Sequence, residues 1–212
     1  MERHVASSTG TPSTAYRSDW TRPVKTERER MNHYPGQGSM WFFVIGDLWI
    51  FGCYFACYMY ERGQDAQAFL RGQRLLSRGV GVINTVILLT ASLFVAICVQ
   101  ATRAGDTKAA SRSLALGGAC GAGFMLVKAC EWYAKITAGF PRSTEKFFTY
   151  YFMLTGLHVV HVALGLLILL LAWRELRKAE RPVAAFVEAC ATYWHMVDSL
   201  WIIIFALVYL VR

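Results

Sequence analysis

Several features that mark other protein classes are missing from this sequence of 212 residues. Its six cysteines form no Cys-x-x-Cys pair and all fall within apolar runs, which favours free, packed thiols over a metal or disulfide role. No cleavable signal peptide is visible, because the first apolar run begins only near Met40. The connections between apolar runs, 9 to 19 residues long, are too short to build a soluble catalytic domain.

Acidic residues are also few: 14 Asp and Glu stand against 22 Lys and Arg, which gives a net charge of +8. Such an excess can indicate nucleic-acid binding, but here the basic residues lie in short connections between apolar runs. In that position they more often set membrane topology or contact anionic lipid. We therefore expect membrane lipids as partners, and no nucleic acid.

The chain is rich in apolar residues, which make up 55% of the sequence. A bilayer core about 30 Å thick requires runs of about 20 apolar residues, and inside it the backbone must satisfy its own hydrogen bonds as helices. The sequence predicts an all-α integral membrane bundle of five transmembrane helices within residues 40–212. The five segments are Trp41–Tyr60, Val80–Val99, Leu114–Tyr133, Phe147–Trp173 and Val183–Val211.

Residues 1–39 are polar, and we expect a disordered cytoplasmic tail with a short surface helix within 24–34. The tail and the connections at 101–113 and 174–182 hold 13 Lys and Arg, against 8 on the other side. The richer side should be cytoplasmic, which places the N-terminus inside and the C-terminus outside a cell inner membrane.

Two further patterns concern packing. Gly117 and Gly121 have the spacing that lets membrane helices approach closely. Aromatic residues cluster near the ends of the apolar runs and are expected to anchor the helices at the membrane interface. These anchors include Trp41, Tyr58, Tyr60, Trp132, Tyr133, Tyr150, Tyr151, Trp173 and Tyr209.

Ionisable residues inside membrane helices are costly, so each needs a partner or a purpose. Asp47 lies about two turns into the first segment, and two interpretations stay open: a proton-linked or lipid-headgroup role, or a hydrogen bond between helices. Lys128 and Glu131 lie three residues apart on one helix face, which favours a neutralising pair.

A polar stripe runs along the last two segments. His158 and His161 share a face of the fourth segment, and Glu188, His195 and Asp198 follow on the fifth. Together with Glu131 these side chains have the chemistry of a di-metal bundle site, so a membrane di-metal enzyme is one hypothesis. The alternative, favoured by the spacing, is a network of hydrogen bonds that fixes the helix packing.

Four of these stretches resemble subunit III of the haem-copper oxidases, the cytochrome c oxidase family. Asn84-Thr-Val-Ile-Leu-Leu-Thr-Ala-Ser92 resembles its Asn-Thr helix, and Gly123-Phe124 to Glu131-Trp132 resembles its helix ending in Glu-Tyr. Thr155-Gly-Leu-His158-Val-Val-His161-Val is similar to its Thr-Gly-x-His-x-x-His-Val motif. Phe186 through Tyr193-Trp194-His195-Met-Val-Asp198 is similar to its Trp-His-x-Val-Asp ending.

The chain departs from the family pattern at several points. Five helices stand where the family often has seven, so the lipid-filled cleft built with the first two is in doubt. Asp47 takes the place of a membrane Glu, Val99-Gln100-Ala101 replaces a His, and Lys128 stands where larger members often have Gln. These features look most like the short branch encoded beside bacterial nitric oxide reductases.

The resemblance implies a non-catalytic accessory subunit that packs on a catalytic haem-bearing membrane subunit and supports stability and proton uptake in respiratory electron transport. It implies no haem, copper or other metal and no active site in this chain, with phospholipid as an allowed ligand. The proton-linked or lipid candidate is Asp47. The structural polar core would comprise Lys128, Glu131, His158, His161, Glu188, His195 and Asp198. A transient assembly factor of the same complex is the other alternative, and the resemblance leaves open whether O₂ or NO is reduced.

Overall fold

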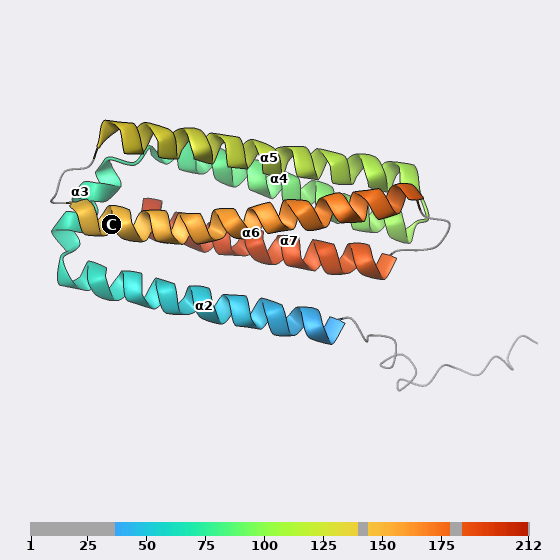
Figure 1. Ribbon diagram of the computed structural model, residues 1–212, viewed down its shortest axis with the longest axis horizontal. Coiled ribbons are helices and arrows are strands. Elements are labelled where there is room, and N and C mark those ends of the chain that lie inside the picture. Colours follow the sequence, from blue (N-terminus) through green and yellow to red (C-terminus); the bar gives the residue numbers. More distant parts are fainter. Residues whose placement is uncertain (1–36, 140–143, 179–183, 212) are drawn as a thin grey trace, which may run out of the picture. The chain divides into compact units, whose positions relative to one another are not determined.

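The computed structural model describes residues 37–139, 144–178 and 184–211. The polar tail expected at 1–39, with its short helix within 24–34, lies almost entirely outside the described residues. The described elements are all helical, so the prediction of an all-α membrane bundle is confirmed. They are α2 (Gln37–Gln64), α3 (Ala66–Arg74), α4 (Arg78–Arg103), α5 (Thr107–Ala138), α6 (Glu145–Lys178), α7 (Ala184–Phe205) and the π-helical turn η3 (Ala206–Leu210) (Figure 1).

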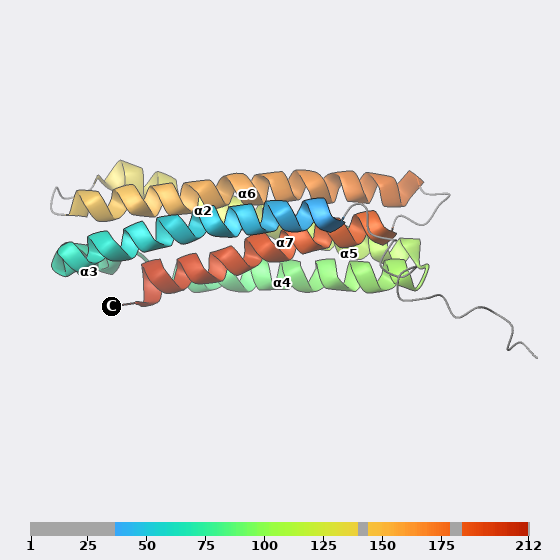
Figure 2. The same ribbon diagram turned by 90° about the horizontal axis from the view of Figure 1, so that it is seen from below.

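Short, capped turns make successive long helices antiparallel. The Asp106 carboxylate accepts a hydrogen bond from the backbone N–H of Ala109 at 2.9 Å and so caps the N-terminus of α5. Gly105 and Gly139 adopt the left-handed conformation, with φ of 81° and 70°, at the two ends of α5. Because the turn before α5 is so short, α4 and α5 lie side by side along their length (Figures 1 and 2).

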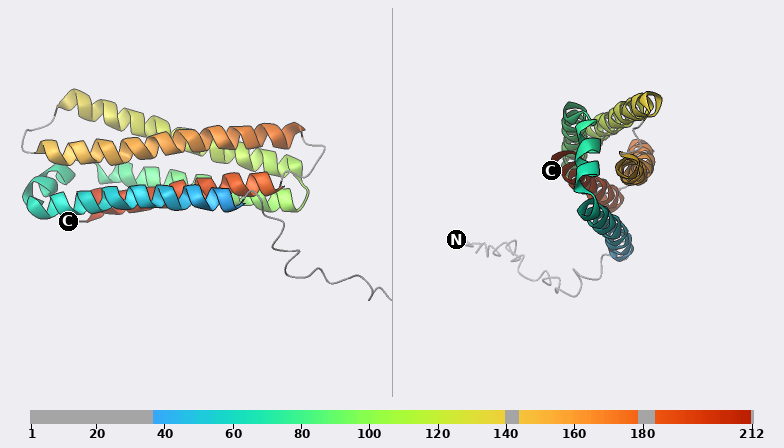
Figure 3. Two further views of the ribbon diagram at one scale, coloured as in Figure 1. Left: turned by 60° about the horizontal axis from the view of Figure 1, so that its bottom comes forward. Right: turned by 90° about the vertical axis from the view of Figure 1, so that its left-hand side faces the viewer.

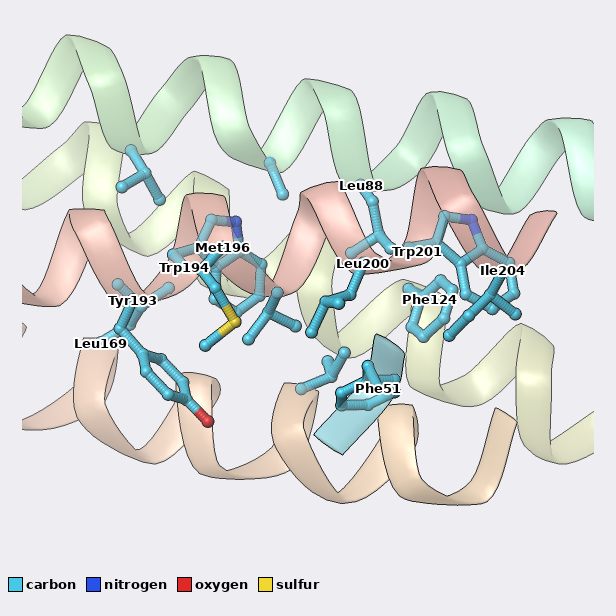
Figure 4. Packing of buried hydrophobic residues seen from close by; sticks show 14 of the residues in the cluster. Phe51, Leu88, Phe124, Leu169, Tyr193, Trp194, Met196, Leu200, Trp201 and Ile204 are labelled. Carbon is cyan, nitrogen blue, oxygen red and sulfur yellow. The ribbon is translucent and has the colours of Figure 1, made fainter. Parts of the chain in front are cut away.

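The central helix of the bundle is α7. In its most apolar stretch 61% of the residues are buried, against 28–33% in the corresponding stretches of α4, α5 and α6. It contacts α4, α6 and α2, and its side chains Trp194, Leu200 and Trp201 fill the space among them (Figure 4). Most of α7 is thus shielded from lipid by the other helices.

The Gly117–Gly121 pair allows close packing, as predicted. A Cβ atom on Gly117 would lie 3.2 Å from the backbone oxygen of Ala91 in α4, so even a methyl group there would need the facing helix to shift by a few tenths of an ångström. A Cβ on Gly121 would lie 2.6 Å from the ring of Trp194, which therefore occupies the space that this glycine leaves.

The short helix α3 was not predicted. It lies across one end of the bundle (Figure 3, right), with Phe69 fully buried beneath it. The side-chain amide of Gln73 donates to the backbone oxygens of Leu207 and Val211, at 3.3 and 2.9 Å. The connection between α2 and α4, which contains α3, therefore holds the C-terminal residues of the chain against the bundle.

Four helices of the described part are long and apolar enough to cross a membrane: α4, α5, α6 and the stretch from α7 through η3. The sequence led us to expect five spans, and four of the described helices meet this criterion of length and composition. The remaining long helix, α2, has 28 residues and is not among these four.

Candidate functional site

The described bundle holds one fully enclosed charge pair, which we call the Lys128 cage: Lys128, Glu131, Tyr151, Trp201 and Tyr209. The Lys128 ammonium lies 2.8 Å from a Glu131 carboxylate oxygen, and the two side chains are only 1% and 4% exposed. The ammonium also donates to the hydroxyls of Tyr151 and Tyr209, at 3.1 and 3.2 Å. The Tyr209 hydroxyl in turn donates to the second Glu131 oxygen at 2.9 Å.

Aromatic rings complete the cage. The Lys128 nitrogen lies 5.0 Å from the ring centroids of Tyr151 and Trp201 and 5.6 Å from that of Tyr209, distances at which a cation is attracted to a ring face. Tyr209 comes from the π-helical turn η3, a rare conformation often found at functional positions. Three helices and this turn therefore contribute to neutralising one buried charge.

Neighbouring polar groups lie on the faces where α4 and α6 meet α7. Within the described residues neither ring nitrogen of the buried His158 has a hydrogen-bond partner, and its ring lies between Phe124 and Trp201, with centroids 5.7 and 5.1 Å away. On the other side of α7, the Nδ1 atom of His195 lies 2.6 Å from the Ser92 hydroxyl of α4.

Asp198 is also buried on α7. Neither of its carboxylate oxygens has a partner at hydrogen-bond distance within the described residues, although the Ser92 hydroxyl is nearby. Buried polar groups are normally hydrogen-bonded, so Asp198 differs in this respect from the charged pair of the Lys128 cage.

A second ionisable pair lies on the seam between α2 and α6, and we call it the Asp47–His161 seam. The Nε2 atom of His161 is 3.5 Å from a carboxylate oxygen of Asp47, and the side chains are 16% and 26% exposed. The ring of Phe51 packs against the imidazole with centroids 5.3 Å apart. Unlike the Lys128 cage, this pair is reachable from outside the bundle.

The tautomer of His161 determines what this seam can do. Its Nδ1 atom lies 2.8 Å from the backbone oxygen of Leu157, and because a carbonyl only accepts hydrogen bonds, Nδ1 carries a proton. A neutral His161 would then turn a lone pair on Nε2 towards the Asp47 carboxylate. A favourable contact between the two side chains therefore needs one more proton, on Nε2 or on the carboxylate.

Glu188 lies apart from both groups. Its carboxylate accepts from Nε of Arg103 at 2.7 Å, with side chains 28% and 65% exposed, where α4 ends and α7 begins. The single polar stripe expected from the sequence is thus divided. Lys128 and Glu131 meet in one place, Asp47 and His161 in another, and His195 lies near Asp198 through Ser92.

Sequence reasoning missed the burial of three tyrosines, two of which belong to the Lys128 cage. Tyr58, Tyr151 and Tyr209 were expected as interface anchors, which is wrong, because all three are buried at 0–2% exposure. Trp41, Tyr60 and Tyr133 are exposed, as an anchor requires. The two sets differ in which face of its own helix each side chain occupies, and that face can be assigned only once the neighbouring helices are placed.

The di-metal hypothesis needs several ligands in one place. Among the described residues no three His, Cys, Asp or Glu side chains lie close enough together to hold a metal ion. All its proposed ligands are described, and they lie in the separate groups above. The structure therefore gives this hypothesis no site.

Comparison with known proteins places the chain among respiratory membrane subunits. Residues 36–211 match the family model of cytochrome c oxidase subunit III. Cytochrome c oxidase subunit 3 of Thermostichus vulcanus is 30% identical over 171 residues, which cover 79% of this chain and 83% of the relative. That of Alkalihalophilus pseudofirmus is 28% identical over 214 residues, covering 99% and 98%.

A third relative is larger. The protein of Aeropyrum pernix named heme-copper oxidase subunit I+III is 29% identical over 188 residues, covering 82% of this chain and 22% of the relative. The family match spans α2 to the last described residue and includes the four motifs that carried the resemblance. The chain therefore belongs to the cytochrome c oxidase subunit III family, the accessory subunits of respiratory haem-copper oxidases, as its motifs predicted.

Proposed function

We propose that this chain packs on a catalytic haem-bearing membrane subunit and supports its stability and proton uptake, with no active site of its own. The observation that carries the proposal is the Asp47–His161 seam, a proton-holding pair at the surface of a bundle whose other buried charges are enclosed. The fused relative named for subunits I and III supports subunit I as the partner, because its two parts share one polypeptide.

The seam has suitable chemistry for proton exchange. His161 holds one proton on Nδ1 against the Leu157 carbonyl, so the second proton is shared between Nε2 and Asp47 and can leave or return without a change of fold. The pair is partly exposed between α2 and α6, where water, lipid or the partner subunit can reach it. A proton-linked role for Asp47 is thus favoured over a purely packing role.

The remaining polar residues would act structurally. Lys128 and Glu131 join α5 to α6 and η3 through the two tyrosines, and His195 joins α7 to α4. Glu188 fixes the end of α7 to Arg103 of α4. His158 and Asp198 belong to the same core by position. Such interhelical contacts hold membrane bundles together, because inside the bilayer no hydrophobic driving force brings one helix to another.

The proposed topology has five spans, with α2 as the fifth. At about 1.5 Å per residue its 28 residues reach about 42 Å, enough for the bilayer core, and it runs antiparallel to α4. An odd number of spans places the termini on opposite sides, and the 13-to-8 excess of Lys and Arg puts the N-terminus in the cytoplasm. A reporter fused after Arg212 that is active only in the cytoplasm would contradict this topology.

The partner is tested by purification from native membranes in mild detergent through an affinity tag on this chain. We expect a larger haem-bearing subunit at one-to-one stoichiometry, with haem optical bands that disappear when the two are separated. Recovery at a small fraction of that ratio, seen only during assembly, would favour the transient assembly factor instead. Oxygen and nitric oxide consumption by the purified complex then identify the acceptor, and the nitric oxide reductase branch stays a prediction until that measurement.

A further inference from the structure

A basic hollow lies at the end of the bundle where α5 begins and α6 ends. Its volume is about 310 Å³, and its lining within the described residues comes from the first two turns of α5 and the last turn of α6. The lining residues are Thr107, Lys108, Ser111, Arg112, Leu176 and Arg177. Two hydroxyls and three cations from two different helices thus surround one space, and no carboxylate is among them.

The cations of this hollow differ from others at the same end. Arg103 is paired with Glu188 at 2.7 Å, and Lys178 lies 3.8 Å from Glu175. Neither Lys108 nor Arg112 has an ion pair among the described residues. The nearby Asp106 carboxylate is engaged in capping α5.

Arg177 is held in place by an aromatic ring and has no ion pair among the described residues. Its guanidinium carbon lies 4.7 Å from the ring centroid of Trp173, which orients the group, and no described carboxylate is paired with it. The hollow also sits at the N-terminus of the 32-residue helix α5, whose partial positive charge adds to the three cations. The site therefore has the charge, hydroxyl donors and shape that suit a phosphate group.

A comparable hollow at the opposite end has a different character. It has a volume of about 420 Å³ and lies between α2 and α6, but its cation Lys146 is already paired with Glu61 at 3.4 Å. That hollow carries its own counter-ion. Among the described residues that line the basic hollow, none carries a negative charge.

We propose that the basic hollow binds the phosphodiester headgroup of an anionic phospholipid. A lipid is favoured over a soluble phosphate because the hollow opens at the level where the apolar stretches begin. Leu176 lines it, and exposed leucines continue from it along α5 and α6, at Leu116, Leu170 and Leu171. Acyl chains can lie against those leucines while the headgroup meets the cations. This site is distinct from the Asp47–His161 seam and does not depend on its proton chemistry.

The test uses the full chain in its detergent-purified complex, titrated with dioleoylphosphatidylglycerol and followed by native mass spectrometry. The Lys108→Gln/Arg112→Gln double variant should retain this lipid roughly 25-fold less tightly, at roughly fivefold per basic residue near an anionic surface. The matched control is Arg174→Gln/Lys178→Gln, which removes two charges at the same end but outside the hollow. It should change retention less than twofold.

Two further arms separate the sources of the phosphate. Dioleoylphosphatidylcholine, which has the same acyl chains but no net charge, should bind weakly to the wild type and equally to both variants. Glycerol phosphate at millimolar concentration should fail to displace the bound phosphatidylglycerol. Equal losses in the two double variants would overturn the site, and tight binding of glycerol phosphate alone would overturn the choice of a lipid.

Discussion

The Lys128 cage and the Asp47–His161 seam are both ionisable pairs inside a membrane bundle, yet their surroundings differ. Lys128 and Glu131 are almost fully enclosed, and both side chains are satisfied by hydrogen bonds with two tyrosine hydroxyls: Tyr151 accepts from Lys128, and Tyr209 donates to Glu131. Asp47 and His161 are joined by one 3.5 Å contact on a seam that is partly open. An enclosed pair with several hydrogen-bond partners suits charges that stay in place. A partly exposed pair with one contact suits a proton that is exchanged.

This contrast also separates stability from activity. Removing one member of an enclosed pair leaves an uncompensated charge in a medium of low dielectric constant, which is strongly unfavourable. Removing one member of an open pair leaves a group that water or lipid headgroups can reach. Substitutions in the cage should therefore act on folding, and those in the seam on turnover.

The largest effect is expected from Glu131→Gln. The change keeps the shape of the side chain but leaves the Lys128 ammonium without its counter-ion, at a cost of roughly 3–5 kcal/mol for a broken buried pair. The melting temperature and yield of the purified complex should both fall sharply.

The control for this prediction is the double variant Lys128→Met/Glu131→Gln, which removes both charges. It should recover much of the lost stability, because a neutral cage has no charge to compensate. A Glu131→Gln variant as stable as the wild type, or a double variant no better than the single one, would contradict the enclosed-pair interpretation.

An intermediate effect is expected from His195→Ala. It removes the 2.6 Å contact with Ser92 between α7 and α4, and a lost buried hydrogen bond costs about 1–3 kcal/mol, or nearer 0.6 kcal/mol on average in membrane helices. Glu188→Ala breaks an ion pair that is largely exposed and should lower thermal stability less. Melting curves of both variants in the same detergent give the comparison, and a larger loss for Glu188→Ala would reverse this assignment.

Most helices of this bundle can be predicted from the local sequence, but the contacts of the Lys128 cage cannot. Apolar runs of sufficient length indicate the helices, and the three-residue spacing of Lys128 and Glu131 predicts that they pair. The partners Tyr151 and Tyr209 are 23 and 81 residues away from Lys128, so their contact depends on how α6 and η3 pack. Aromatic residues near helix ends indicate interface anchors by default, and nothing local distinguishes a tyrosine that turns inward.

The seam shows the same limit. Asp47 stands out as a lone carboxylate in an apolar helix, and His161 as half of a His-x-x-His pair, but their meeting joins residues 114 positions apart. The His-x-x-His spacing favours a shared ligand, whereas the structure separates the two rings. His158 faces Trp201 inside the bundle, and His161 faces Asp47 on the seam. Two residues on one helix stripe thus belong to different environments because different helices cover them.

The smallest effect on stability, and the most informative one on function, is expected from Asp47→Asn. The asparagine amide can donate to the Nε2 lone pair of a neutral His161, whose Nδ1 proton stays on the Leu157 carbonyl, so the contact between α2 and α6 persists. The new pair cannot take up or release a proton on the side of residue 47. Melting temperature and subunit stoichiometry should therefore match the wild type, while turnover rate, its pH profile or the lifetime of the complex during turnover should change. His161→Gln should give the same functional change, because it removes the other half of the exchanging pair. If both variants keep the wild-type rate, pH profile and lifetime, Asp47 is a packing residue and the proton-linked role is wrong.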